Sequence, residues 1–180
     1  MIARTAFEQL GLVAHILTHC QEYASRTAKN LNVWVAPAIM HRQIHFVFDT
    51  GGIPIGFWTW AFLGSDVEQR LSRNTEGALH ESEWNEGEAL WIIDFVAPYG
   101  YVRDIVTFMR LEFFRGIDEV KGRRKLRDGS GYRILKRRGS KDGNYEEYRQ
   151  SSHRYRLHRT AYASSYTEWV NNKDRPSTAF

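Results

Sequence analysis

Cysteine is almost absent from this sequence, since Cys20 is the only one. A single thiol excludes a disulfide-stabilised scaffold and is typical of a protein from a reducing compartment. Long apolar runs are missing too, because no stretch reaches the roughly 18 apolar residues that a membrane-spanning helix needs. The segment from Met1 to Glu8 has no long apolar run and no signal-peptide cleavage pattern. The expected location is therefore the cytoplasm.

The residues that are present are those of a folded, globular protein. Hydrophobic residues make up 42% of the chain, charged residues 26% and aromatic residues 14%, with six tryptophans. This composition excludes an intrinsically disordered chain, a collagen and a coiled coil. The length of 180 residues corresponds to one domain.

The net charge of +4 is distributed unevenly along the chain. Residues 1–120 contain 9 basic and 15 acidic residues, whereas residues 121–141 contain 10 basic residues and 1 acidic residue. The second segment therefore creates a local positive field. Two interpretations are open: a solvated surface hairpin, or a docking site for nucleic acid, a membrane surface or an acidic protein.

Hydrophobic periodicity and turn signals predict both helices and strands. We expect helices over residues 5–23, 33–40, 66–72 and 102–114, and strands over residues 44–48, 53–62, 90–97, 117–126 and 132–135. This order predicts an α/β (α+β) fold in which helices flank a mixed, largely antiparallel sheet. The last two strands flank a turn signal at residues 128–131 and carry the positive charge, so we expect them to form a basic hairpin.

The chain is expected to divide into two parts. Residues 1–139 form the folded domain, and residues 140–180 form a tyrosine-rich extension. Aromatic residues recur every seven positions in the extension, at Tyr148, Tyr155, Tyr162 and Trp169. A docking helix and a partly disordered segment both agree with this spacing.

One acidic residue interrupts the most apolar segment of the chain. Asp94 lies within the run LWIIDFVA, residues 90–97. An unpaired, ionised carboxylate in an apolar strand is costly, so a partner group or protonation must compensate for its burial. Asp94 is either a core residue that fixes a loop, or a site carboxylate that orients a base or binds a substrate ammonium group. Its position just before Pro98, near the end of the strand, favours a site.

The same run carries a family signature. Residues 91–100, WIIDFVAPYG, resemble the motif W-[FI]-I-D-[WF]-[IV]-A-P-[FY]-G of the RTX toxin-activating lysine acyltransferases. Residues 54–61, PIGFWTWA, are similar to a second family strand, P-V-[AG]-Y-x-[ST]-W-A. The resemblance covers roughly residues 7–139. It implies a fold similar to the GNAT acyltransferases, and the transfer of a fatty acyl chain from acyl carrier protein to the ε-amino group of a lysine in an RTX protoxin.

The resemblance also assigns catalytic positions. The family's functional aspartate corresponds to Asp94, and its histidine corresponds to Tyr23 when residues 11–39 are aligned without gaps. On the predicted first helix, His19 lies one turn before Tyr23 on the same face. His19 could act as the base, Tyr23 could substitute by hydrogen bonding, or neither could take the role. Cys20 is either an acyl-accepting nucleophile or a half-buried thiol.

Neither a metal site nor a tightly bound cofactor is expected. His15 and His19 are four positions apart, but no third ligand accompanies them. The pyrophosphate loop of GNAT enzymes reads [RQ]-x-x-G-x-[GA], and this chain has Leu126 where the first residue should be, ahead of Gly129 and Gly131. The departure favours acyl carrier protein over coenzyme A as the acyl donor.

Acyl carrier proteins are acidic, so we expect this partner to dock on the basic segment. The candidate contacts are Arg123, Arg124, Lys125, Arg127, Arg133, Lys136, Arg137 and Arg138. The protoxin is the second expected partner, nucleic acid is not favoured, and a homodimer is left open. The alternative function is a catalytically inactive GNAT-like module whose basic hairpin holds an acidic protein or nucleic acid. The missing histidine favours this alternative, whereas the intact motif around Asp94 favours the enzyme.

Overall fold

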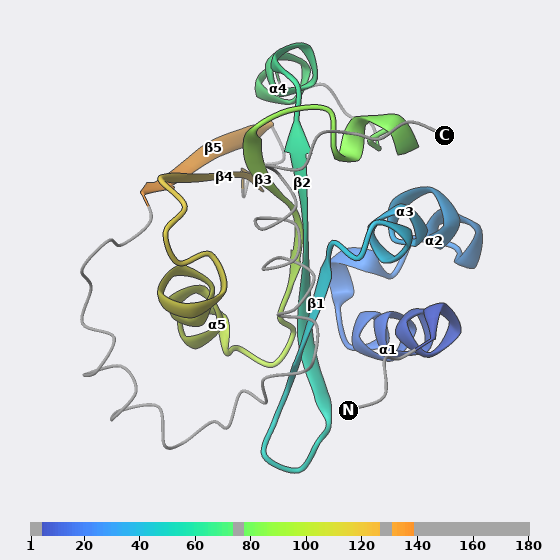
Figure 1. The fold of residues 1–180 in the computed structure, drawn as a ribbon. Helices are drawn as coiled ribbons and strands as arrows, with labels where there is room; N and C mark the ends of the chain where they lie inside the picture. Colours follow the sequence, from blue (N-terminus) through green and yellow to red (C-terminus); the bar gives the residue numbers. More distant parts are fainter. Residues whose placement is uncertain (1–4, 74–77, 127–130, 139–180) are drawn as a thin grey trace.

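The computed structural model of the chain describes residues 5–73, 78–126 and 131–138 (Figure 1). The predicted extension over residues 140–180 lies outside the described residues, as do Arg127 and the side chain of Arg138. None of the helices in the described part combines the length and the apolar character that a bilayer crossing requires.

Helical segments and a five-stranded sheet make up the described part of the chain. The α-helices are α1 (Ala6–Thr18), α2 (Ala28–Trp34), α3 (Ala36–Met40), α4 (Ser65–Ser72) and α5 (Val102–Phe108). Short 3₁₀ turns form η1 (Gln21–Tyr23) and η2 (Glu81–Trp84), and a π-helical turn forms η3 (Met109–Phe113). The strands are β1 (Ile44–Phe48), β2 (Pro54–Leu63), β3 (Ala89–Val96), β4 (Glu119–Lys125) and β5 (Tyr132–Arg138).

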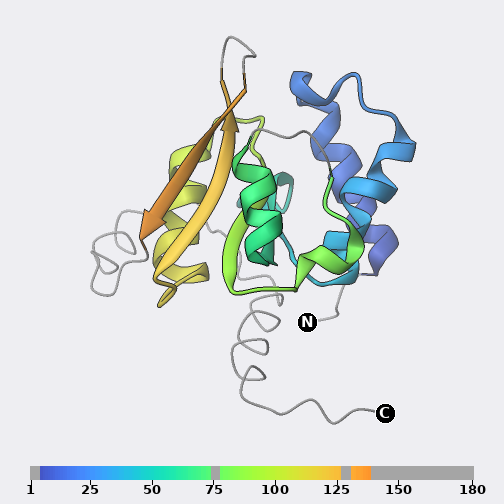
Figure 2. The ribbon, with the colours of Figure 1, turned by 90° about the horizontal axis from the view of Figure 1, so that it is seen from above.

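The sheet has the order β1-β2-β3-β4-β5. Strands β1, β2 and β3 are antiparallel neighbours, β3 and β4 run parallel, and β4 and β5 form an antiparallel hairpin. Helices α1, α2 and α3 cover one face of the sheet and α5 covers the other (Figures 1 and 2). The predicted mixed, largely antiparallel sheet with flanking helices is therefore confirmed, and the arrangement agrees with a GNAT-like fold.

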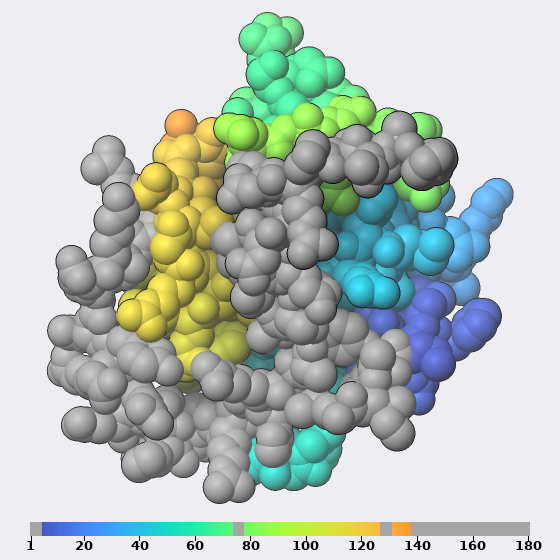
Figure 3. Space-filling model, viewed as in Figure 1, coloured from blue at the N-terminus to red at the C-terminus, as the bar shows by residue number. Residues whose placement is uncertain are grey.

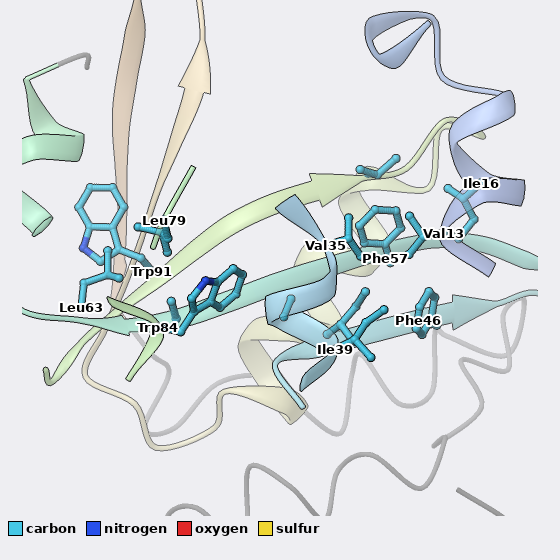
Figure 4. Packing of buried hydrophobic residues seen from close by; sticks show 14 of the residues in the cluster. Val13, Ile16, Val35, Ile39, Phe46, Phe57, Leu63, Leu79, Trp84 and Trp91 are labelled. Atoms are coloured by element: carbon cyan, nitrogen blue, oxygen red, sulfur yellow. The ribbon is translucent and has the colours of Figure 1, made fainter. Parts of the chain in front are cut away.

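Each face of the sheet has its own hydrophobic core. On the α1 side, Val13, Ile16 and Val35 pack toward Phe57 of β2 (Figure 4). On the α5 side, a second cluster contains Trp58 of β2 together with the rings of α5 and η3. The two clusters separate because successive side chains of a strand point to opposite faces. Each fully buried large side chain contributes about 1.5–3 kcal/mol to folding.

The two helical layers also form opposite flanks of the molecular surface. In the space-filling view, α5 and β4 appear in yellow on one flank and α1 to α3 in blue on the other (Figure 3).

The parallel pairing of β3 with β4 is short, since the two strands are joined only at Trp91–Lys121 and Ile92–Gly122. Beyond these pairs the two strands diverge.

The first helix is shorter than the predicted span of residues 5–23, because it ends at Thr18. The Thr18 hydroxyl donates to the His15 carbonyl at 2.7 Å, and this carbonyl is the acceptor that the His19 N–H would use in a continuing α-helix. The His19 N–H instead donates to the carbonyl of Ile16. The prediction that His19 and Tyr23 share one helical face is therefore wrong, and Tyr23 lies on the separate turn η1.

Two other helix predictions need a local correction. The span 33–40 contains two helices, since α2 ends at Trp34 and α3 begins at Ala36. Pro37 explains the break, because it lacks the N–H that a continuous helix would donate to the carbonyl of residue 33. The span 102–114 is helical as far as Phe113 and widens into η3, where the Phe114 N–H donates to the Met109 carbonyl at 2.8 Å.

Candidate active site

Strand β3 contains a β-bulge next to Asp94. The register with β2 passes from Thr59–Asp94 to Trp60–Ile92, so Ile93 has no partner on β2. A bulge of this kind adds one residue to one strand and changes which face the following side chains occupy.

The bulge decides which face of the sheet presents Asp94. Before the bulge, Leu90 and Ile92 belong to the core on the α5 side, and Trp91 belongs to the core on the α1 side. After it, Val96 lies on the α1 side, and Asp94 is two residues away from Val96 and shares that face. Without the extra residue, strict alternation from Ile92 would have directed Asp94 into the aromatic core under α5.

The α1 side of the sheet brings Tyr23 to Asp94. The Tyr23 hydroxyl donates a hydrogen bond to Oδ1 of Asp94 at 2.6 Å, and the Phe95 N–H donates to the same oxygen at 3.0 Å. Both side chains are half-buried. The structure thus pairs Asp94 with Tyr23, the position that the sequence resemblance assigned to a histidine, although the two residues are far apart in sequence.

The environment of the pair shifts both proton affinities upward. Burial raises the pKa of Asp94 to about 6, although the hydrogen bonds from Tyr23 and Phe95 and the positive charge of Arg26 act in the opposite direction. Burial and the neighbouring Asp94 charge raise the pKa of Tyr23 well above its ordinary value. Near neutral pH the pair therefore consists of a neutral phenol and a carboxyl group that titrates close to that pH.

An aromatic stack supports Tyr23, and its second ring, Trp34, also donates toward Asp94 and favours the ionised carboxylate, which lowers the pKa of Asp94. The Tyr23 ring stacks on Trp34 of α2, with ring centroids 5.0 Å apart and an interplanar angle of 15°. The guanidinium carbon of Arg26 lies 4.7 Å from the Trp34 ring centroid and 5.4 Å from that of Tyr23. A cation against stacked rings restricts the rotamers of all three side chains, so Tyr23 is held in the orientation that reaches Asp94.

His19 lies at the edge of this site and not at its centre. Its ring contacts His15 and Tyr99, each at a centroid distance of 5.4 Å, and the side chain is exposed. Among the described residues, no hydrogen bond connects His19 to Asp94. His19 nevertheless lines the same groove as the Tyr23–Asp94 pair.

Cys20 also lines this groove and is half-buried. Burial raises the pKa of its thiol above the ordinary value. A thiol is nucleophilic as the thiolate, so this shift disfavours an acyl-enzyme at Cys20. The half-buried thiol interpretation agrees with its packing against the core on the α1 side.

A groove of ≈ 1960 Å³ contains these residues. Its lining includes Tyr23 and Trp34 from one face of the sheet, Asp94 from β3, and Val106 and Arg110 from the opposite face. Both faces of the sheet therefore contribute to one groove, next to the point where β3 and β4 diverge. The volume exceeds the roughly 300–1,000 Å³ of ordinary small-molecule sites and suits an extended ligand.

The basic hairpin borders this groove. Five of its predicted docking residues contribute to the lining, namely Arg123, Arg124, Lys125, Lys136 and Arg137. Arg133 is exposed on β5 and is not part of that lining. Arg123 lies over the Tyr132 ring, with 4.5 Å between its guanidinium carbon and the ring centroid.

The glycines near residue 130 belong to a connection between strands. The Leu126 N–H donates to the Gly131 carbonyl at 2.8 Å, and the pairing of β4 with β5 begins next to it, at Lys125 and Tyr132. The flanks of this segment are thus those of a hairpin and not of a loop that leads into a helix. In the described part of the chain, no group of three potential metal ligands comes together.

Sequence reasoning did not identify Trp34 and Arg110 as groove residues. Trp34 is the last residue of α2, whose start is marked by the Thr27–Asn30 capping box, and this signal could have located the helix correctly. No sequence signal distinguishes Arg110 from the other arginines of the chain.

Several known proteins are similar to this chain in sequence. The model of the "RTX toxin acyltransferase family" matches residues 2–137. The leukotoxin-activating lysine-acyltransferase of Aggregatibacter actinomycetemcomitans is 31% identical over 120 residues, which cover 64% of this chain and 70% of the relative. The RTX-II toxin-activating lysine-acyltransferase of Actinobacillus pleuropneumoniae is 31% identical over 113 residues, 63% of this chain and 69% of the relative. A protein-lysine myristoyltransferase of Kingella kingae is 28% identical over 111 residues, 62% of this chain and 65% of the relative.

Proposed function

The chain belongs to the RTX toxin acyltransferase family, and we propose that its groove moves a fatty acyl group from acyl carrier protein to a lysine of an RTX protoxin. Relatives from several bacteria are named as lysine acyltransferases, and protein-lysine acylation is the activity of this chain as well. Of the two functions that the sequence left open, family membership favours the enzyme over the inactive binding module.

The reaction needs a base, because only a neutral amine attacks a thioester. A free lysine has a pKa of about 10.4, so at neutral pH it must lose a proton. Its nitrogen then bonds to the thioester carbonyl carbon, the carbon–sulfur bond breaks, and the carrier thiol leaves with a proton. A positioned base accelerates such a step by about 10²–10⁴-fold.

The observation that carries the assignment of this base is the Tyr23–Asp94 hydrogen bond inside the groove. Asp94 has a pKa of about 6, so it is ionised at neutral pH and still basic enough to accept a proton. The raised pKa of Tyr23 keeps its phenol protonated, so it serves as a donor that holds Asp94 in place. In this proposal Asp94 accepts the lysine proton, and His19 contributes at the rim.

Charge supports acyl carrier protein as the donor. Among the described residues, no carboxylate lies within ion-pair distance of Arg124, Lys125 or Arg137, so these charges remain available to an acidic partner. No tightly bound cofactor is required, since the donor brings its own thioester. A carrier-dependent reaction takes place in the cytoplasm, which agrees with the reducing compartment favoured by the lone Cys20.

Mass spectrometry of protoxin lysines tests the proposal. The protein is incubated with acyl carrier protein loaded with a fatty acyl group and with an RTX protoxin. Wild type should acylate defined lysines, and Asp94→Asn should lower the rate at least 100-fold. His19→Ala should cost less than tenfold. A wild-type protein that transfers nothing, under conditions where a relative does, would contradict the proposed function, and an unimpaired Asp94→Asn variant would contradict the assignment of the base.

A further inference from the structure

Arg110 is an arginine in the groove without a described partner. It lies in η3, lines the groove and is half-buried. Its Nε atom is buried and has no hydrogen-bond partner among the described residues, and no carboxylate among them forms an ion pair with it. A guanidinium stays charged at every physiological pH, and an unpartnered buried N–H is costly. An anionic ligand would satisfy both requirements.

The hairpin contributes further arginines on the same side of the sheet. The β4–β5 register pairs Arg124 with Arg133 and Val120 with Arg137, and cross-strand partners share a face. Val120 packs against the α5 core, so this face is the α5 side. Its basic residues are all arginines, whereas the opposite face of the hairpin also carries lysines. Arg124 and Arg137 line the groove together with Arg110.

The backbone that carries Arg110 has an irregular helical geometry. Turn η3 is π-helical, with the Phe114 N–H bonded to the carbonyl five residues earlier. Such turns contain one extra residue and occur frequently at functional sites. Arginine forks match the oxygens of phosphate groups in a bidentate manner.

We propose that Arg110 and Arg124 bind the phosphate of a 4′-phosphopantetheine arm on the α5 side of the groove. The inference rests on the proposed function, because a carrier-bound thioester must enter the groove together with this phosphate. The arm would pass between the diverging strands β3 and β4, with its phosphate on the α5 side and its thioester at Asp94. The same phosphate occurs in coenzyme A, so the test must separate the two sources.

Calorimetric titration with small ligands tests the site without acyl transfer. Wild type should bind 4′-phosphopantetheine at least tenfold more tightly than pantetheine, which lacks the phosphate, because a hydrogen bond to a charged group is worth about ten- to hundredfold in affinity. Arg110→Gln should remove this preference, and Arg110→Lys should retain part of it. Arg103→Gln is the matched control, since Arg103 is exposed on α5 and is not part of the groove lining. Arg124→Gln should weaken the same preference, again compared with Arg103→Gln.

The source of the phosphate is tested with the intact donors. Holo acyl carrier protein, apo acyl carrier protein and coenzyme A are titrated against wild type and Arg110→Gln. Loss of affinity in the variant for the holo carrier and not for the apo carrier supports a carrier-borne arm, and loss for coenzyme A alone overturns that source. Equal binding of phosphopantetheine and pantetheine to wild type, or equal behaviour of Arg110→Gln and Arg103→Gln, overturns the subsite. If the phosphate preference holds but no acyl transfer occurs, the proposed function fails and the subsite stands.

Discussion

Replacement of Tyr23 by Phe tests how the carboxylate is controlled. The change removes one hydroxyl, which donates to Asp94 at 2.6 Å, and leaves the ring stacked on Trp34. This hydrogen bond favours the ionised carboxylate, so its loss must raise the pKa of Asp94 above the value of about 6. The base is active when ionised, and the transfer rate therefore rises with pH through this pKa.

The size of the shift follows from the strength of the bond. A hydrogen bond to a charged group contributes about 1.5–3 kcal/mol, and each pH unit corresponds to about 1.4 kcal/mol. We expect the pKa of Asp94 to rise by about one to two pH units in Tyr23→Phe. At pH 7 the ionised fraction then falls about two- to tenfold. Near pH 9 the variant should approach the wild-type rate if Tyr23 only positions Asp94.

The pH dependence of kcat/KM measures this shift, because it reports the titration of the free enzyme. Tyr99→Phe is the matched control, since it removes the hydroxyl of a ring that contacts His19 and has no described bond to Asp94. A loss of about 10²–10⁴-fold at every pH would assign Tyr23 to proton transfer and not to positioning. An acid limb that stays in place, with unchanged kcat/KM, would refute the reasoning.

Three further predictions concern stability, each measured by urea unfolding. Asp94→Asn should raise the free energy of unfolding at pH 7.5 by about 2–3 kcal/mol. The carboxyl has a pKa of about 6 in the folded protein, against an ordinary value of 3.8, so its ionisation destabilises the fold. An unchanged or lower stability would contradict this prediction. His45 is buried among aromatic rings, and burial lowers its pKa to about 3. The free energy of unfolding should therefore be constant above pH 6.5 with respect to this group and fall by about 1.4 kcal/mol per pH unit below it. His45→Phe should remove this pH dependence. Glu68 accepts hydrogen bonds from the Trp91 indole and from Lys121 where β3 meets β4. Glu68→Gln should therefore lower the free energy of unfolding by about 1–3 kcal/mol. A double-mutant cycle with Lys121→Met that finds no coupling energy would contradict this prediction.

The strands and the two hairpins of the sheet could be predicted because the information is local in sequence. The hairpin of β1 and β2 follows from two runs rich in strand formers around the turn at residues 49–52, and the basic hairpin follows from the turn near Gly131. Asp94 was identified for the same reason, since a carboxylate within an apolar run is visible without any tertiary information. These predictions needed only the alternation of side chains and the position of turn residues.

The partner of Asp94 could not be predicted because it depends on two backbone irregularities. Helix α1 ends where the Thr18 hydroxyl donates a hydrogen bond to the carbonyl of His15. Because the helix ends there, Tyr23 does not share a helical face with His19. The bulge at Ile93 then directs Asp94 toward η1. Neither feature has a pattern in the sequence, since Thr is common in continuing helices and isoleucine is an ordinary strand residue.

Tyrosine at position 23 changes which group of the pair titrates near neutral pH. In a histidine–aspartate pair the imidazole takes the proton and the carboxylate stays ionised to orient it. Here the raised pKa of Tyr23 removes it from that range, and burial brings Asp94 to about 6. The carboxylate therefore replaces the imidazole as the titrating base, with almost the same proton affinity as a free histidine, whose pKa is about 6.5. In the proposed mechanism, burial of the carboxylate thus compensates chemically for the missing histidine, and the site keeps the family's reaction with a different residue at one of its two positions.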